Sequence, residues 1–191
     1  MKKSLFILLI LSLCVFINVA SLAANVGDGF ISSKSINSQY FKIYMEHGVD
    51  EQTLAMRIST PSSIRAIVRR TAPRTLDMPS QFDILYLAVS EIMDIHLHTF
   101  ECTVKVCRDA DSLSRVAENL FGSRIKAGGF YVTAINTIYV DAENVNIHVL
   151  GHELSHAIQT QYFVVPPPAT IQEVLAGFVE YQLRKYTDSL P

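Results

Sequence analysis

Five consecutive residues, His152-Glu153-Leu154-Ser155-His156, place a glutamate between two histidines that are four positions apart. In a helix, positions i and i+4 lie on one face about one turn apart, so both imidazole rings could bind the same Zn²⁺. Glu153 would lie beside the metal, where its carboxylate could take a proton from a zinc-bound water. This H-E-x-x-H pattern therefore predicts two zinc ligands and a general base on a single helix.

The residues around the motif are mostly apolar from Val145 to Ile158, and the charge is concentrated in the motif itself. A mostly buried helix that retains two histidines and a glutamate needs partners for them, because unpaired buried polar groups are costly. The alternative is a surface helix with two solvated histidines. The apolar context favours the metal site.

A third ligand is expected from the next segment, residues 171–183, whose apolar residues recur at helical spacing. Three prolines at 166–168 separate this segment from the first helix, and Thr170 is a candidate N-cap. Two helices joined by a short proline loop can pack antiparallel, which would bring Glu173 or Glu180 near the histidines. A carboxylate would complete a His₂Glu site and leave the fourth zinc position open, as a catalytic zinc requires.

The two segments together resemble the gluzincin zinc metallopeptidases of the peptidase MA-like group. Those enzymes carry H-E-x-x-H and then a helix reading N-E-G-h-A-x-x-h-E, in which h is apolar; residues 172–180 here read Gln-Glu-Val-Leu-Ala-Gly-Phe-Val-Glu. The resemblance implies that Glu173 is the third zinc ligand and that Glu180 hydrogen-bonds a ligand histidine. Val174 stands where the family usually has glycine, and Gly177 where the thermolysin-like branch has aspartate. The similarity is therefore nearer to the aminopeptidase-like or peptidase MA-like branch.

The rest of the chain predicts an α+β fold. Residues 128–132 and 136–141 resemble the strand pair that precedes the zinc helix in this family, where the edge strand binds substrate in extended form. Other segments read as elements of a small mixed sheet packed against helices, which the resemblance implies is zincin-like. The expected strands are 40–45 and 103–106, and the expected helices are 49–58, 64–70, 79–96 and 111–121.

The N-terminus predicts export. Lys2 and Lys3 precede an almost wholly apolar run from Leu5 to Ala20, and small residues follow at a suitable cleavage site, so residues 1–24 read as a signal peptide. The alternative is a retained anchor, although the apolar run is short for a membrane span. We expect a flexible segment at 25–38, a single metallopeptidase domain at 39–191, no stable membrane anchor after cleavage, and a secreted or periplasmic location in a bacterial cell envelope.

Charge and size exclude some classes of partner. The 191-residue chain holds 16 lysines and arginines against 18 acidic residues, and two of the basic residues lie in the predicted signal. No basic patch is evident, so we expect no nucleic-acid partner. The sequence leaves the oligomeric state open.

Two cysteines remain after the predicted signal, Cys102 and Cys107. An oxidising compartment favours a disulfide between an even pair. Five extended residues span about 16 Å, however, which is too far for a bridge within one straight strand. Both a disulfide and two buried thiols therefore remain open.

The expected function is a zinc-dependent metallopeptidase that hydrolyses a peptide or protein substrate by means of a zinc-bound water, with Glu153 as general base. Candidates for the group that stabilises the oxyanion are Tyr131, Tyr139, Tyr162 and Tyr181. Two alternatives remain open: a non-catalytic zinc-binding scaffold of the envelope, and a zinc amidase acting on a non-peptide cell-wall substrate. His148, one turn before His152, and the pair His96 and His98, at a predicted helix end, are interpreted as structural.

Overall fold

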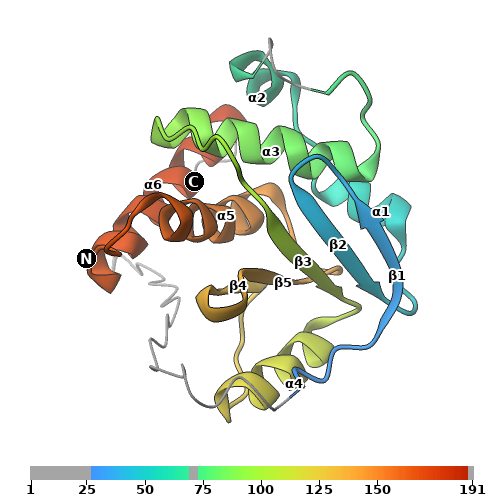
Figure 1. The fold of residues 1–191 in the computed structure, drawn as a ribbon. Helices are drawn as coiled ribbons and strands as arrows, with labels where there is room; N and C mark the ends of the chain where they lie inside the picture. The colour runs from blue at the N-terminus through green and yellow to red at the C-terminus, as the bar shows by residue number, and fades with distance from the viewer. Residues whose placement is uncertain (1–26, 69–72, 189–191) are drawn as a thin grey trace, which may run out of the picture.

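The computed structural model describes residues 27–68 and 73–188. Over these residues the chain is α+β, as the sequence predicts, with one five-stranded mixed sheet packed against helices (Figure 1). The strands are β1 (Ser32–Asn37), β2 (Phe41–Glu46), β3 (Cys102–Cys107), β4 (Gly129–Val132) and β5 (Thr137–Asp141). The helices are α1 (Glu51–Arg57), α2 (Ser62–Ile67), α3 (Met78–Met93), α4 (Ala110–Phe121), α5 (Ile147–Tyr162) and α6 (Ala169–Tyr186), with a short 3₁₀ turn at Thr133–Ile135.

The sheet has the strand order β1-β2-β3-β5-β4. Its three central strands are parallel, and their register aligns Ile43 with Val104 and Val104 with Ile138. These three side chains are fully buried, which is expected of a parallel core covered on its faces by helices. The outer strands β1 and β4 each pair antiparallel with their neighbour. β4 thereby forms the sheet edge nearest to α5.

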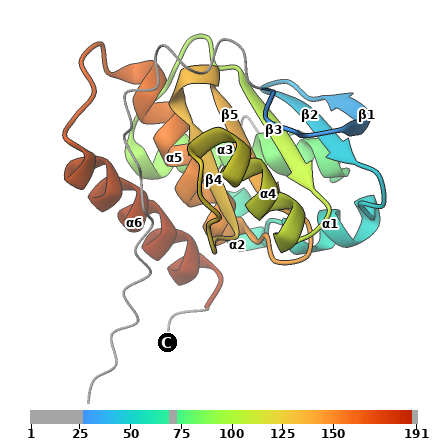
Figure 2. The same cartoon turned by 90° about the horizontal axis from the view of Figure 1, so that it is seen from below.

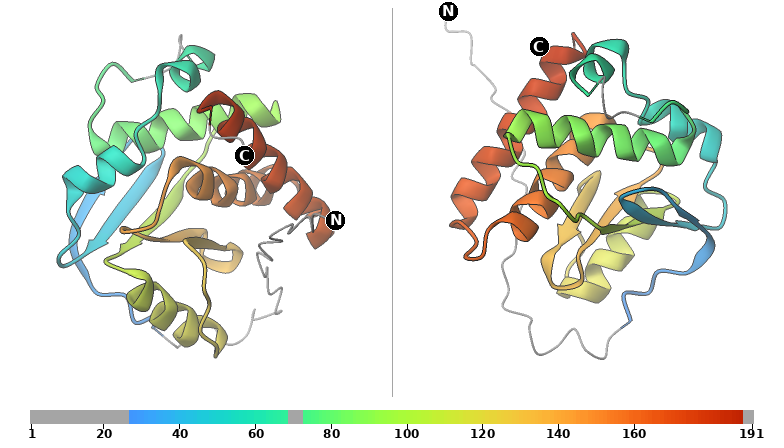
Figure 3. Two further views of the ribbon diagram at one scale, coloured as in Figure 1. Left: turned by 180° about the vertical axis from the view of Figure 1, so that it is seen from behind. Right: turned by 45° about the horizontal axis from the view of Figure 1, so that its top comes forward.

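Helices cover both faces of the sheet. Contacts join α3 to β2 and α5, and α5 to β4 and β5, whereas α4 contacts β3 and β5 from the opposite face (Figures 1 and 2). The larger apolar core lies on the side of α3 and α5, and a smaller cluster of Cys107, Leu113, Val116 and Tyr139 lies under α4. The last helix, α6, lies against α5 (Figure 3) and also contacts α3 and α2.

The N-terminal boundary differs from the one expected. Residues 32–37 form strand β1 within the segment expected to be flexible, so the sheet begins well before residue 39. Its side chains are mostly exposed, and for that reason its sequence lacks the apolar alternation that marks a half-buried strand. The strand is held by backbone pairing with β2.

Two helix ends also differ from the sequence-based expectation. The long helix α3 ends at Met93 with Asp94 in the left-handed conformation, so His96 and His98 lie beyond its last turn. At the start of α6 the N-cap position is occupied by Pro168, and Thr170 lies inside the helix. Neither change moves the residues of the two motifs.

Cys102 and Cys107 are free, buried thiols in this structure. Cys102 belongs to the core on the α3 side, and Cys107 belongs to the cluster under α4. Because an odd spacing of five puts two residues of a strand on opposite faces of the sheet, a bridge between them is geometrically excluded while β3 remains a regular strand.

The predicted signal peptide, residues 1–24, lies outside the described residues. Among the helices of the described ranges, none combines the length and apolar character that crossing a membrane requires.

Candidate metal centre

Helix α5 begins where Asn146 accepts hydrogen bonds from the backbone N–H groups of His148 and Val149, at 2.9 and 3.1 Å. This N-cap satisfies two of the donors that a helix start leaves unpaired. The helix buries Leu150, Leu154, Ala157 and Ile158 in the main core. His152 and His156, four residues apart, are thereby held on a side of the helix that faces α6.

Helix α6 brings the two glutamates to this side of α5. Ala176, Val179 and Leu183 are fully buried on its inner face, and the helix packs closely on α5 at Gly151. The residues that the sequence analysis selected, Glu173 and Glu180, lie two turns apart on the same helix. Both glutamates therefore contact the histidines.

Three side chains converge as the sequence predicts. The Nε2 atoms of His152 and His156 are 3.3 Å apart, and the two oxygens of Glu173 lie 3.6 Å from His152 Nε2 and 3.5 Å from His156 Nε2. Ligand atoms of all three residues lie within 4.8 Å of one another. A His₂Glu zinc site draws one donor atom from each residue, about 2.0–2.2 Å from the metal; here a different oxygen of Glu173 faces each histidine. Two imidazoles and a carboxylate at these separations could hold a zinc ion.

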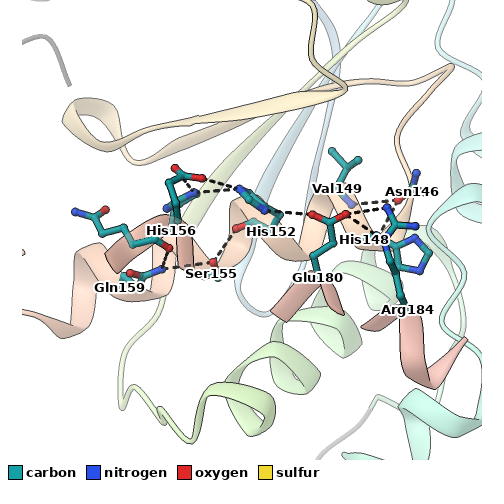
Figure 4. A network of polar contacts seen from close by, with 11 residues as sticks. Asn146, His148, Val149, His152, Ser155, His156, Gln159, Glu180 and Arg184 are labelled. Atoms are coloured by element: carbon teal, nitrogen blue, oxygen red, sulfur yellow. Dashed lines mark hydrogen bonds and ion pairs between the residues drawn. The ribbon is translucent and has the colours of Figure 1, made fainter. Parts of the chain in front are cut away.

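Glu180 contacts the other nitrogen of the first histidine. Its Oε2 atom lies 3.5 Å from His152 Nδ1, whereas its Oε1 atom accepts hydrogen bonds from Arg184 (Figure 4). Nδ1 and Nε2 are distinct atoms of one ring, so Glu180 can orient the ring while Nε2 faces Glu173 and His156. This position agrees with the role that the resemblance implies for Glu180.

Glu153 is almost fully buried, at 6 % exposure, on the neighbouring face of α5. Burial raises the pKa of its carboxyl to about 7; the nearby His152 lowers the pKa to a lesser extent, and the negative charge of Glu173 raises it further. The backbone of Tyr131 in the edge strand β4 lowers this pKa to a lesser extent. Glu153 therefore has a pKa suited to proton transfer near neutral pH, on a helix that contacts the edge strand.

The surroundings of the two histidines shift their pKa values in opposite directions. Burial, assisted by the neighbouring His152, lowers the pKa of His156 to about 3, so this ring is neutral at pH 7. Burial acts in the same direction on His152, but the hydrogen bond to Glu180 and the nearby carboxylates outweigh it and raise the pKa. The bond from His152 in turn lowers the pKa of Glu180 to about 2, despite desolvation.

The remaining residues singled out from the sequence lie elsewhere. The Tyr131 hydroxyl bonds to Asn136 Oδ1 at 3.0 Å, and the Tyr139 hydroxyl donates to Asp28 at 2.5 Å, so both are engaged away from the histidines. Tyr162 and Tyr181 are about half exposed. His148 Nε2 lies 3.0 Å from Thr187 Oγ1 and joins the first turn of α5 to the residue after α6, in agreement with a structural role.

Two contributors to the site were missed in the sequence analysis. Arg184 follows Glu180 by four residues, a spacing that indicates an ion pair on one helix face and could have revealed it. Ser155, inside the motif, donates a hydrogen bond to the backbone carbonyl of His152 at 2.8 Å. Its hydroxyl oxygen also accepts a hydrogen bond from the side-chain amide of Gln159. Ser155 and Gln159 are also four residues apart, so the same helical spacing could have indicated this contact.

Comparisons with protein-family models, with curated proteins and with solved structures found no match to this chain.

Proposed function

We propose that this protein is a secreted, zinc-dependent metallopeptidase of gluzincin-like type, with a zincin-like domain. The observation that carries the proposal is the convergence of His152, His156 and Glu173, whose ligand atoms lie within 4.8 Å of one another, next to the buried carboxyl of Glu153. A site built only to hold metal needs the three ligands but has no use for a buried glutamate beside them. Export is proposed from the apolar N-terminal run.

When bound, zinc would supply Lewis acidity for attack of water on an amide carbonyl. Glu153 would accept the proton of the attacking water and pass it to the leaving amine. A pKa near 7 suits both steps, since the carboxyl can be charged before the attack and neutral after it. The neutral ring of His156 could bind the metal without first losing a proton, whereas His152, whose pKa is raised, would have to release its proton.

The substrate would lie along β4. This strand pairs with β5 on one side and is the last strand of the sheet in the described residues. An extended peptide could add to such an edge through main-chain hydrogen bonds. The packing of α5 on β4 supports this placement, because the helix that carries the proposed base lies against the edge strand.

The test begins with the zinc content of the protein expressed from residue 25 and with a quenched-fluorescent peptide library. We expect one zinc per chain and hydrolysis of some library members. The Glu153→Gln variant should keep the zinc and lose at least about 100-fold in rate, since general-base catalysis contributes roughly 10² to 10⁴. A wild-type protein that binds no zinc would refute the proposal.

The two alternatives give different results in the same assay. A non-catalytic scaffold would bind zinc but cleave nothing, and Glu153→Gln would then leave every measured property unchanged. An amidase of the cell wall would bind zinc, ignore the peptide library and release fragments from purified peptidoglycan in a Glu153-dependent way. Either result would replace the peptidase assignment.

A further inference from the structure

Arg184 makes an unusual contact with Glu180. Its Nε and Nη2 atoms both bond to the same oxygen, Oε1, at 3.1 and 2.8 Å. The other oxygen, Oε2, is left to His152 Nδ1 at 3.5 Å. The carboxylate is thus divided between the two partners, with one oxygen for each (Figure 4).

Ordering this carboxylate needs a partner, because a glutamate side chain loses rotamer entropy when it is fixed. Glu180 is about one-third exposed, so water competes for its oxygens. A guanidinium that donates twice to Oε1 restricts rotation of the carboxylate and leaves Oε2 directed at the ring. The position of His152 therefore depends on a contact that begins one turn further along α6.

Arg184 is itself part of an anchored helix end. Its backbone carbonyl accepts a hydrogen bond from Thr187 Oγ1 at 3.1 Å, and that hydroxyl also contacts His148 Nε2 of α5 at 3.0 Å. The last turn of α6 is thereby tied to the first turn of the helix that carries the histidines. This tie fixes the origin of the Arg184 side chain relative to His152.

We propose that Arg184 is a positioning residue of the metal centre. By binding one oxygen of Glu180 it presents the other to His152 Nδ1, and so orients the ring whose Nε2 faces Glu173 and His156. The inference rests on the proposed function, since it concerns the same zinc site. It adds a residue that binds Glu180 and would act on the metal ligands through that carboxylate.

The direction in which zinc affinity changes when Arg184 is removed distinguishes a positioning role from an effect of its charge alone. Arg184 is a cation, so its removal would strengthen the binding of Zn²⁺ if only long-range electrostatics mattered. Loss of the positioning contact should instead weaken the binding of Zn²⁺. Lys185, the exposed neighbour in the last turn of α6, offers a matched control for the change in charge.

The experiment measures zinc dissociation constants of the full mature chain by competition with a chromophoric chelator. We expect Arg184→Ala to reduce zinc affinity roughly three- to tenfold. This is at or below the lower end of the effect typical for residues that orient metal ligands. Arg184→Lys should recover part of the loss, because lysine keeps the charge and one donor. Lys185→Ala should leave affinity unchanged or slightly increased. The melting temperature of each metal-free variant reports whether the fold is intact.

A double-mutant cycle completes the test. In a Glu180→Gln background, Arg184→Ala should cause little further loss of affinity, because its route to His152 has already been weakened. The inference is overturned if Arg184→Ala behaves like Lys185→Ala, or if it weakens zinc equally in both backgrounds. Should Arg184→Ala fold poorly, the same comparison between Arg184→Lys and Lys185→Ala decides. Wild-type protein without zinc would refute the proposed function itself, whereas zinc-binding protein indifferent to Arg184 would refute only this inference.

Discussion

Gly151 of α5 packs directly against Leu183 of α6, where the two helices that form the site meet. A Cβ atom added to Gly151 would lie 2.2 Å from Leu183 Cδ1, and Leu183 is fully buried. We expect Gly151→Ala to force this leucine, and with it α6, away from α5, at a cost of about 1–3 kcal/mol of unfolding free energy. Because His152 is the next residue, zinc affinity should fall as well. Urea unfolding of the metal-free protein and zinc titration measure the two effects.

Gly177 provides the matched control on α6. A Cβ atom there would meet nothing within 4 Å, and the residue is exposed. Gly177→Ala should therefore stabilise the helix by about 0.5–1 kcal/mol, because alanine has less backbone entropy to lose. Zinc affinity should not change. Equal destabilisation by the two alanines would contradict the role given to the contact between Gly151 and Leu183.

Asp83 holds the turn between β1 and β2 from the middle of α3. Its buried carboxylate accepts three hydrogen bonds. One comes from Ser38 Oγ at 2.7 Å, and the other two come from the backbone N–H groups of Gln39 and Tyr40 at 3.1 and 3.3 Å. Asp83→Ala would leave these donors without their acceptor, and we expect a loss of about 2–4 kcal/mol in urea unfolding. Glu91→Ala, an exposed change on the same helix, should stay within about 0.5 kcal/mol. If Glu91→Ala lowered the unfolding free energy by the same amount, the effect of Asp83→Ala would come from a change in the helix and not from loss of its contacts with the turn.

Interactions between residues close in the sequence could be predicted, whereas contacts between distant segments could not. The motif on α5 and the glutamates on α6 could be predicted because helical spacing fixes relative positions within each segment, and the three-proline connection limits how the two helices can meet. β1 could not be predicted, since an exposed strand is stabilised by backbone pairing that leaves no apolar alternation. The contact between Asp83 and residues 38–40 joins positions more than 40 apart, and no local pattern reports it.

Glu173 and Glu180 should differ sharply when each is removed. Glu173 offers both oxygens to the Nε2 atoms of the two histidines, whereas Glu180 reaches only His152 Nδ1. We expect Glu173→Ala to abolish stoichiometric zinc binding and Glu180→Ala to weaken it by roughly 10- to 100-fold. Metal analysis after dialysis against a weak chelator distinguishes the two. Retention of full zinc by Glu173→Ala, together with loss in Glu180→Ala, would exchange the roles of the two glutamates.

The buried carboxyl of Glu153 should make the stability of the metal-free protein depend on pH. Burial raises its pKa in the folded state to about 7 from an ordinary value of 4.5, so the folded protein binds the proton more tightly than the unfolded chain does. The resulting stability is fully present below pH 4.5 and is lost as the pH rises through 7.

His156 acts in the opposite direction, because its pKa is lowered to about 3 and its contribution is lost as the pH falls below 6.5. That contribution is common to the wild type and Glu153→Gln, so the difference between them reports Glu153 together with its share in the raised pKa of His152. Unfolding in urea between pH 5 and 8 should show the wild type losing on the order of 3 kcal/mol relative to Glu153→Gln. Parallel curves would mean that Glu153 keeps an ordinary pKa and is already charged at the start of that range, which would remove the argument for a base tuned by burial.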